Sequence, residues 1–100
     1  MKSEKHIILI VRTDVMPEME EEFNRWYNEE HIPRLLKVPG VLSAKRGTST
    51  ADGQKYIALY EHESGDVQKT SAYREALETD WSNKIRPYLR NFTREIYELL

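Results

Sequence analysis

In the first third of the chain, apolar residues first form a short continuous run and then recur at helical spacing. The run from His6 to Val11 is short and β-branched, which predicts a strand buried on both faces. Thr13 and Asp14 are expected to end it. Pro17 can begin a helix, because a proline in the first turn loses no needed donor, and the four glutamates that follow suit the positive end of the helix dipole. Pro33 is expected to end this helix, since the residue before a proline is pushed out of the α region.

The remaining two thirds predict a hairpin, a second helical region and a last strand. Strands are predicted over residues 41–50 and 55–62, because the hairpin-type residues 51–53 separate them. Asp80 is a candidate cap for a second short helical piece, and the tail over residues 91–100 is assigned as the fourth strand. Between hairpin and tail, apolar residues four apart share one helical face: Tyr73, Leu77, Trp81 and Ile85.

This order of elements predicts an α+β fold of the ferredoxin-like βαββαβ type. Four antiparallel strands would form one sheet with the helices on one face. A chain of 100 residues without an internal linker is expected to be a single domain, residues 1–100. So short a chain has a thin core, which makes pairing with a second copy favourable.

The composition excludes several classes of function. There is no cysteine, so disulfides, thiolate catalysis and cysteine-based metal sites are excluded. A net charge of −2 gives no strong attraction to nucleic acid or an anionic membrane. The apolar run near the N-terminus is too short for a membrane span or signal peptide, so a cytoplasmic protein is expected. The four scattered glycines form no phosphate loop, and the three histidines lack metal-ligand spacing, so neither a cofactor nor a metal is expected.

A cluster around His31 suggests acid/base chemistry. Tyr27 and Asn28 lie four and three residues before His31, so both can touch the imidazole from one helix surface. If the helix ends near Pro33, the negative end of its dipole would favour the protonated ring. A histidine can exchange a proton near neutral pH, and the neighbouring hydroxyl and amide could orient a substrate oxygen. The structural alternative is a helix-end histidine beside a core tyrosine.

The run Phe23–Pro33 (FNRWYNEEHIP), followed by Leu35–Gly40 (LLKVPG), resembles the dimeric α/β-barrel superfamily in its EthD-like branch and the muconolactone-type isomerases. The resemblance implies a homodimer whose two sheets pack into a barrel, with a pocket between the helices and sheet of each subunit. Relatives act on lactones or aromatic intermediates, often without a cofactor. It also implies that His31 faces the pocket as an acid/base residue. The absence of cysteine rules out an isomerase that uses a pocket thiol.

Three further residues are candidates for binding a substrate. Alternation along the second strand places Leu42, Ala44 and Arg46 on one face, where the planar guanidinium could bind a carboxylate or enolate oxygen. A salt bridge or surface position is the structural alternative for Arg46. Tyr60 is expected to line the pocket or the dimer barrel, and Trp81 to form pocket wall, with a core role as the alternative for both.

The leading functional hypothesis is a cofactor-independent enzyme acting by proton transfer, of the isomerase, cyclase or lyase type. Its substrate would be a small aromatic or lactone-like intermediate, with His31 as the acid/base residue. One alternative is a non-catalytic dimeric module that binds a small molecule or has a stress-related role. Another is a cofactor-free monooxygenase of the antibiotic-biosynthesis type, in which the substrate itself activates oxygen.

Overall fold

A computed structural model describes residues 5–100 of the chain. The first half comprises β1 (Ile7–Val15), the 3₁₀ turn η1 (Pro17–Met19), α1 (Glu20–Trp26), the π-helical segment η2 (Tyr27–His31), α2 (Ile32–Leu36) and β2 (Val41–Thr48). The second half comprises β3 (Tyr56–His62), the 3₁₀ turn η3 (Val67–Lys69), α3 (Ser71–Leu77), α4 (Asp80–Ile85), the 3₁₀ turn η4 (Arg86–Tyr88) and β4 (Leu89–Glu98).

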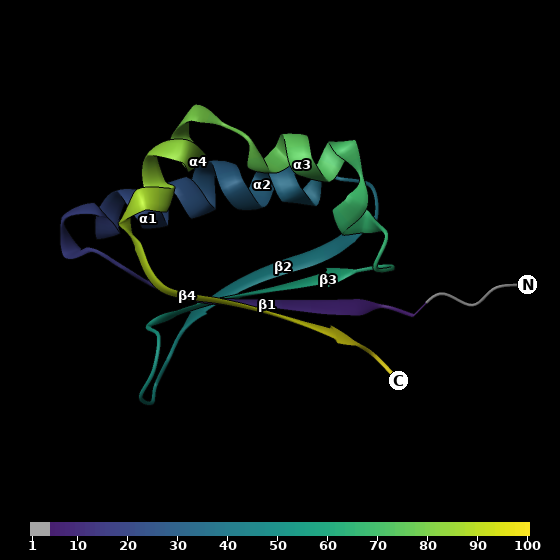
Figure 1. Ribbon diagram of the computed structural model, residues 1–100, viewed down its shortest axis with the longest axis horizontal. Coiled ribbons are helices and arrows are strands. Elements are labelled where there is room, and N and C mark those ends of the chain that lie inside the picture. Colours follow the sequence, from purple (N-terminus) through teal and green to yellow (C-terminus); the bar gives the residue numbers. More distant parts are fainter. Residues whose placement is uncertain (1–4) are drawn as a thin grey trace, which may run out of the picture.

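The strands form one antiparallel sheet in the order β2-β3-β1-β4. All helices lie on the same face of this sheet (Figure 1). The predicted ferredoxin-like α+β fold is therefore confirmed. Each half contributes a strand, a helical region and a second strand, and β1 and β3 pair in the middle, so the two halves share one core.

The core lies between the helices and the inner face of the central strands. Strand alternation turns Leu9 and Val11 of β1, and Ala58 and Tyr60 of β3, toward the helices, where they are buried. Phe23 of α1 is fully buried against them. The edge strand β4 differs, because most of its side chains remain exposed even on the helix-facing side.

The prediction that Thr13 and Asp14 end the first strand is wrong, because β1 continues to Val15. Both polar side chains find partners that keep the backbone extended. The buried Thr13 hydroxyl donates to the Arg90 carbonyl at 3.1 Å. The Asp14 carboxylate accepts from the Lys55 backbone N–H at 2.8 Å and from the Asn91 side chain at 2.8 Å.

Pro33 does not end the first helical region, which runs on to Leu36. A proline inside an α-helix lacks its N–H and its ring clashes with the carbonyl four residues back. Here the preceding turn is π-helical, with the Ile32 N–H donating to the Tyr27 carbonyl five residues back. This wider turn accommodates Pro33. The predicted position of His31 at a helix C-terminus is therefore wrong.

The second helical region is divided into α3 and α4. Thr79, rather than the predicted Asp80, caps α4, because its side-chain oxygen accepts from the Ser82 N–H at 2.9 Å. Tyr73 and Ile85 are buried in the core, and Leu77 and Trp81 pack against it. The shared apolar face thus survives the break.

A bulge in β2 changes the predicted alternation of that strand. Val41 pairs with His62 and Ser43 with Glu61, so Leu42 is the extra residue. Leu42 is consequently 47% exposed, while Ala44 and Arg46 turn inward. The prediction that Leu42 shares a face with Arg46 is wrong for this reason.

No helix within residues 5–100 is long and apolar enough to cross a membrane. In the same part of the chain, histidine, aspartate and glutamate side chains form no group of three that could hold a metal ion.

Candidate functional site

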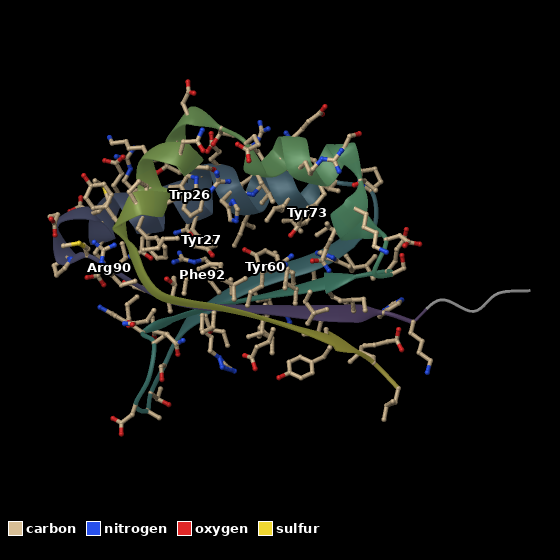
Figure 2. The ribbon with its side chains drawn as sticks, in the orientation of Figure 1. Trp26, Tyr27, Tyr60, Tyr73, Arg90 and Phe92 are labelled. Atoms are coloured by element: carbon tan, nitrogen blue, oxygen red, sulfur yellow. The ribbon has the colours of Figure 1, made fainter. Side chains whose placement is uncertain are left out.

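A cavity of about 610 Å³ lies between the helical layer and the sheet. Figure 2 shows Trp26, Tyr27 and Tyr73 projecting from the helices toward Tyr60 and Phe92 on the sheet. All five of these aromatic residues line the cavity, together with His31. The volume falls within the range of about 300–1,000 Å³ that is typical of small-molecule sites.

The π-helical segment brings His31 against Trp26. In a regular α-helix, residues five apart differ by about 140° around the axis and cannot stack on one another. Here the two rings are stacked, with centroids 4.3 Å apart and an interplanar angle of 26°. The edge of Tyr27 meets the same imidazole at 5.0 Å. The wider turn therefore collects three rings on the cavity side of one helix.

His31 sits in an environment that disfavours its charged form. Burial, followed by the positive charges of Arg86 and Arg46, lowers its pKa from 6.5 to about 4. Its Nδ1 atom is buried without a hydrogen-bond partner among the described residues. His31 is therefore a neutral imidazole at pH 7. This corrects the expectation that a helix dipole would favour protonation.

Two tyrosines complete the polar part of the cavity. Burial raises the pKa of Tyr27, and it raises the pKa of Tyr60 well above its usual value of 10. Both phenols therefore stay protonated at neutral pH. Within residues 5–100 the buried Tyr60 hydroxyl forms no hydrogen bond of normal geometry, but it interacts with the Tyr27 hydroxyl. The two phenols thus form a polar pair at the cavity wall.

Arg46 lies behind the cavity wall and does not line it. Its guanidinium is 4.4 Å from the centroid of the Tyr27 ring and donates to Asn24 Oδ1 at 2.7 Å and Asn28 Oδ1 at 3.1 Å. A cation over an aromatic face is attracted to the ring. Arg46 thus fixes Tyr27 from the side facing away from the cavity. Asn28 is exposed and contributes to this support rather than to the cavity lining.

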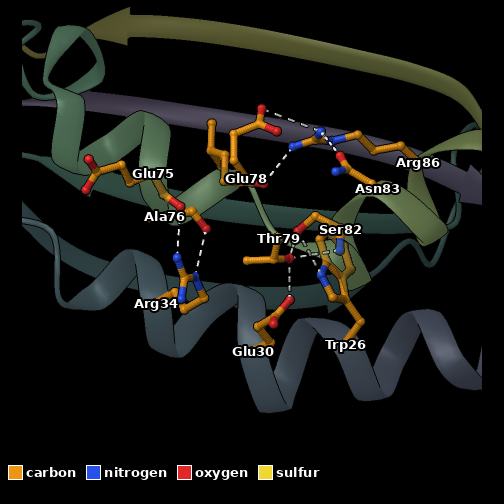
Figure 3. Close-up of polar contacts among 11 residues, drawn as sticks. Trp26, Glu30, Arg34, Glu75, Ala76, Glu78, Thr79, Ser82, Asn83 and Arg86 are labelled. Carbon is orange, nitrogen blue, oxygen red and sulfur yellow. Dashed lines mark hydrogen bonds and ion pairs between the residues drawn. The ribbon is translucent and has the colours of Figure 1, made fainter.

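Trp81 also lies outside the cavity. Its indole N–H donates to Glu22 at 3.2 Å, and the Arg25 guanidinium lies 5.8 Å from its ring centroid. Trp26 occupies the cavity wall instead, with its N–H donating to Ser82 Oγ at 3.1 Å. Figure 3 shows this contact within a network in which the Thr79 hydroxyl also donates to Glu30.

Of the predicted site residues, the structure places His31, Tyr27 and Tyr60 together at the cavity. Sequence reasoning missed Trp26, Phe92 and the two arginines, Arg86 and Arg94. Alternation along the tail would have placed Phe92 and Arg94 on one face. The position of Trp26 beside His31 follows from the π turn, for which the sequence shows no clear signal.

His31 should make stability depend on pH. Its pKa in the folded protein lies below the ordinary 6.5, so the unfolded chain binds the proton more readily. The stability tied to the neutral ring is present above pH 6.5 and is lost as the pH falls toward 4. We expect the change from pH 7 to pH 4.5 to lower the free energy of unfolding less in His31→Gln than in the wild type, by about 1–3 kcal/mol, as measured by chemical denaturation. His62 is present in both proteins, so its contribution cancels. Equal losses would contradict the neutral assignment.

Comparisons with known proteins agree with the fold. A protein from Nitrosomonas europaea, provisionally named an antibiotic biosynthesis monooxygenase, superposes with a TM-score of 0.73 at 14% identity, covering 100% of this chain and 95% of that one. SnoaB, a cofactor-independent oxygenase from Streptomyces nogalater, superposes with a TM-score of 0.63 at 14% identity, covering 96% of this chain and 94% of SnoaB. A conserved protein of unknown function from Bacteroides thetaiotaomicron, described as a candidate oxidoreductase, superposes with a TM-score of 0.72 at 16% identity. The superposition covers 96% of this chain and 99% of that one.

These neighbours share the ferredoxin-like fold, and an EthD-like assignment finds no support among them. A search of curated proteins finds no match to this sequence. The model of a domain of unknown function, DUF4286, matches residues 6–98. That match spans nearly the whole chain, and the chain therefore belongs to the DUF4286 family.

Proposed function

We propose that this protein is a cofactor-free monooxygenase that acts on a polyphenolic aromatic substrate. The observation that carries the proposal is the cavity in which a neutral His31 lies among aromatic rings, beside the buried phenols of Tyr27 and Tyr60. The names of two structural neighbours, an oxygenase and a provisionally named monooxygenase, favour oxygen chemistry over the isomerase, cyclase or lyase type.

The walls of the cavity suit a flat ring system. Trp26, Tyr73 and Phe92 offer ring surfaces, and Leu9 and Val11 supply an apolar floor. Aromatic rings stack at small cost in side-chain entropy, so an aromatic substrate gains affinity from such walls. The Tyr27 hydroxyl, at the cavity wall, can donate to a substrate oxygen.

Proton removal would begin at His31. Because Nδ1 is enclosed, Nε2 is the nitrogen that meets the substrate, and it accepts a proton when Nδ1 carries the ring hydrogen. A base with a pKa of about 4 removes a phenolic or enolisable proton poorly on its own. A substrate anion formed beside the imidazole would raise the pKa of His31, and nearby arginines would stabilise that anion.

The remaining chemistry belongs to the substrate and O₂. For an activated methylene, loss of one proton leaves a carbanion delocalised over the rings. This carbanion reduces O₂ and forms a C–O bond, giving a hydroperoxide after protonation. Loss of the second methylene proton then breaks the O–O bond and releases water, so that CH₂ plus O₂ becomes C=O plus H₂O. The protein supplies orientation, exclusion of water and the first proton acceptor.

The other predicted residues have supporting roles in this proposal. Arg46 and Asn28 would act as positioning residues, because the guanidinium holds the Tyr27 ring and Asn28 holds the guanidinium. Trp81 would help to fix α4 against α1 through Glu22.

We also propose that the protein is a homodimer built on the open face of the sheet. Ile10, Ile57 and Leu59 lie on the face away from the helices, where Ile10 of β1 pairs with Leu59 of β3. Tyr97 of β4 extends the same face and is 50% exposed. An apolar sheet face of this kind is commonly covered by a partner.

Light scattering at micromolar concentration should give twice the chain mass of 11.9 kDa. Leu59→Lys, which places a charge on the open face, should shift the protein toward the monomer. Leu36→Lys, at an exposed position on α2, is the matched control and should remain dimeric. A wild-type monomer would refute the proposal.

Oxygen uptake with a panel of anthrones, which carry the activated methylene, tests the enzymatic proposal. Wild type should consume one O₂ per product carbonyl formed, and His31→Gln should lower kcat by about 100-fold or more. His6→Gln is the matched control, because His6 is exposed and paired with Glu61 outside the cavity. It should retain full activity.

The other functional hypotheses predict different results in this assay. Product rearrangement without oxygen uptake, lost in His31→Gln, would favour the isomerase, cyclase or lyase reading. Binding without any turnover would favour a non-catalytic module. Oxygen uptake that persists in His31→Gln would remove His31 from the reaction.

A further inference from the structure

Two arginines supply the formal charge on the cavity wall. Among the described residues that line the cavity, Arg86 and Arg94 are the charged ones, and no aspartate or glutamate accompanies them. Arg86 belongs to η4, next to the helical layer, and Arg94 belongs to β4 on the sheet. From this pair we infer that the natural ligand of the cavity is an aromatic carboxylate, recognised chiefly by Arg94. The inference rests on the proposed use of the cavity as a substrate site.

Arg94 is available to a ligand. It pairs with Val11 across the sheet, which places it on the helix-facing side. Its guanidinium contacts the side-chain oxygen of Gln68, a neutral partner, and within residues 5–100 it joins no ion pair. By contrast, Arg12 lies on the opposite face of the same sheet and pairs with Glu95 at 3.3 Å. Arg94 therefore keeps its charge uncompensated beside the cavity.

Arg86 is held in place largely by neutral acceptors. Its guanidinium donates to Asn83 Oδ1 at 2.8 Å, a contact that Figure 3 includes, and it also donates to the Leu77 carbonyl at 2.7 Å. The nearest carboxylate oxygen, on the exposed Glu78, is 3.7 Å away. An exposed ion pair at that distance compensates little of the charge. The effect of Arg86 on the pKa of His31 shows that its field reaches the centre of the site.

The rest of the lining decides what kind of anion fits. Trp26, Phe92 and the neighbouring apolar side chains offer a surface for rings and few donors for a small hydrated ion. A free phosphate would lose its hydration without satisfying its oxygens. An aromatic carboxylate can instead place its rings against the apolar walls and its charged group on the Arg94 fork.

The test compares binding of 3-hydroxy-2-naphthoate with binding of its uncharged methyl ester, by fluorescence titration of the full chain. Wild type should bind the acid at least about tenfold more tightly than the ester, because a charge-assisted pair is much stronger than a neutral contact. Arg94→Gln should reduce that ratio to about one, with ester binding unchanged, and Arg94→Lys should restore part of it. Arg12→Gln, the matched arginine on the opposite face, should retain the wild-type ratio.

Each other outcome overturns the inference. Equal binding of acid and ester by wild type, or an acid preference that survives Arg94→Gln, would remove the recognition role of Arg94. Failure to bind either probe would remove the aromatic class. Displacement of the acid by inorganic phosphate at equal concentration would mean that the site recognises small anions. Oxygen uptake with an anthrone, together with no preference for the acid over the ester, would refute this inference and leave the proposed function standing. Acid preference without oxygen uptake on any anthrone would do the reverse.

Discussion

The site depends on the stacking of His31 against Trp26. These residues are five positions apart, and only the wider π turn brings their rings to 4.3 Å. The same turn allows the helix to continue through Pro33, so that α2 can cover the sheet beyond the cavity. The π turn therefore both buries the imidazole and lets the helical layer extend past Pro33. Segments of π-helix are frequent at functional sites, and here the reason is geometric.

Support for this arrangement comes from outside the cavity. Arg46 reaches from β2 onto the face of Tyr27 that points away from the cavity, and it is itself held by two asparagines of the helical region. The Tyr27 edge then meets His31. A strand, a helix and the imidazole are thus linked through the Tyr27 ring, which also lines the cavity. On the other side, the Trp26 indole is fixed by Ser82 of α4.

The sequence predicted the fold more fully than the site. Strand and helix periods, with the hairpin at residues 51–53, were sufficient for the βαββαβ order. The sequence does not predict the helix through Pro33 or the bulge at Leu42. Each depends on a shift of one residue in the backbone hydrogen bonds, and the pattern of apolar and polar side chains does not indicate such a shift. His31 was found from its neighbours, but its neutral state depends on burial and on Arg86, which is distant in sequence. Nothing in the residues around Arg94 marks it as a cavity residue, and only the pairing of β4 with β1 places it at the cavity.

A ferredoxin-like fold hosts many reactions, so the proposed chemistry depends on the protonation state of His31 rather than on the architecture. A titration of the His31 ring nitrogens by ¹⁵N NMR in the intact protein tests it most directly. The expected result is a neutral ring at pH 7 that gains a proton only near pH 4. A ring that is half protonated near its ordinary 6.5 would show that His31 is open to water, and it would contradict the enclosed site on which the proposed chemistry depends.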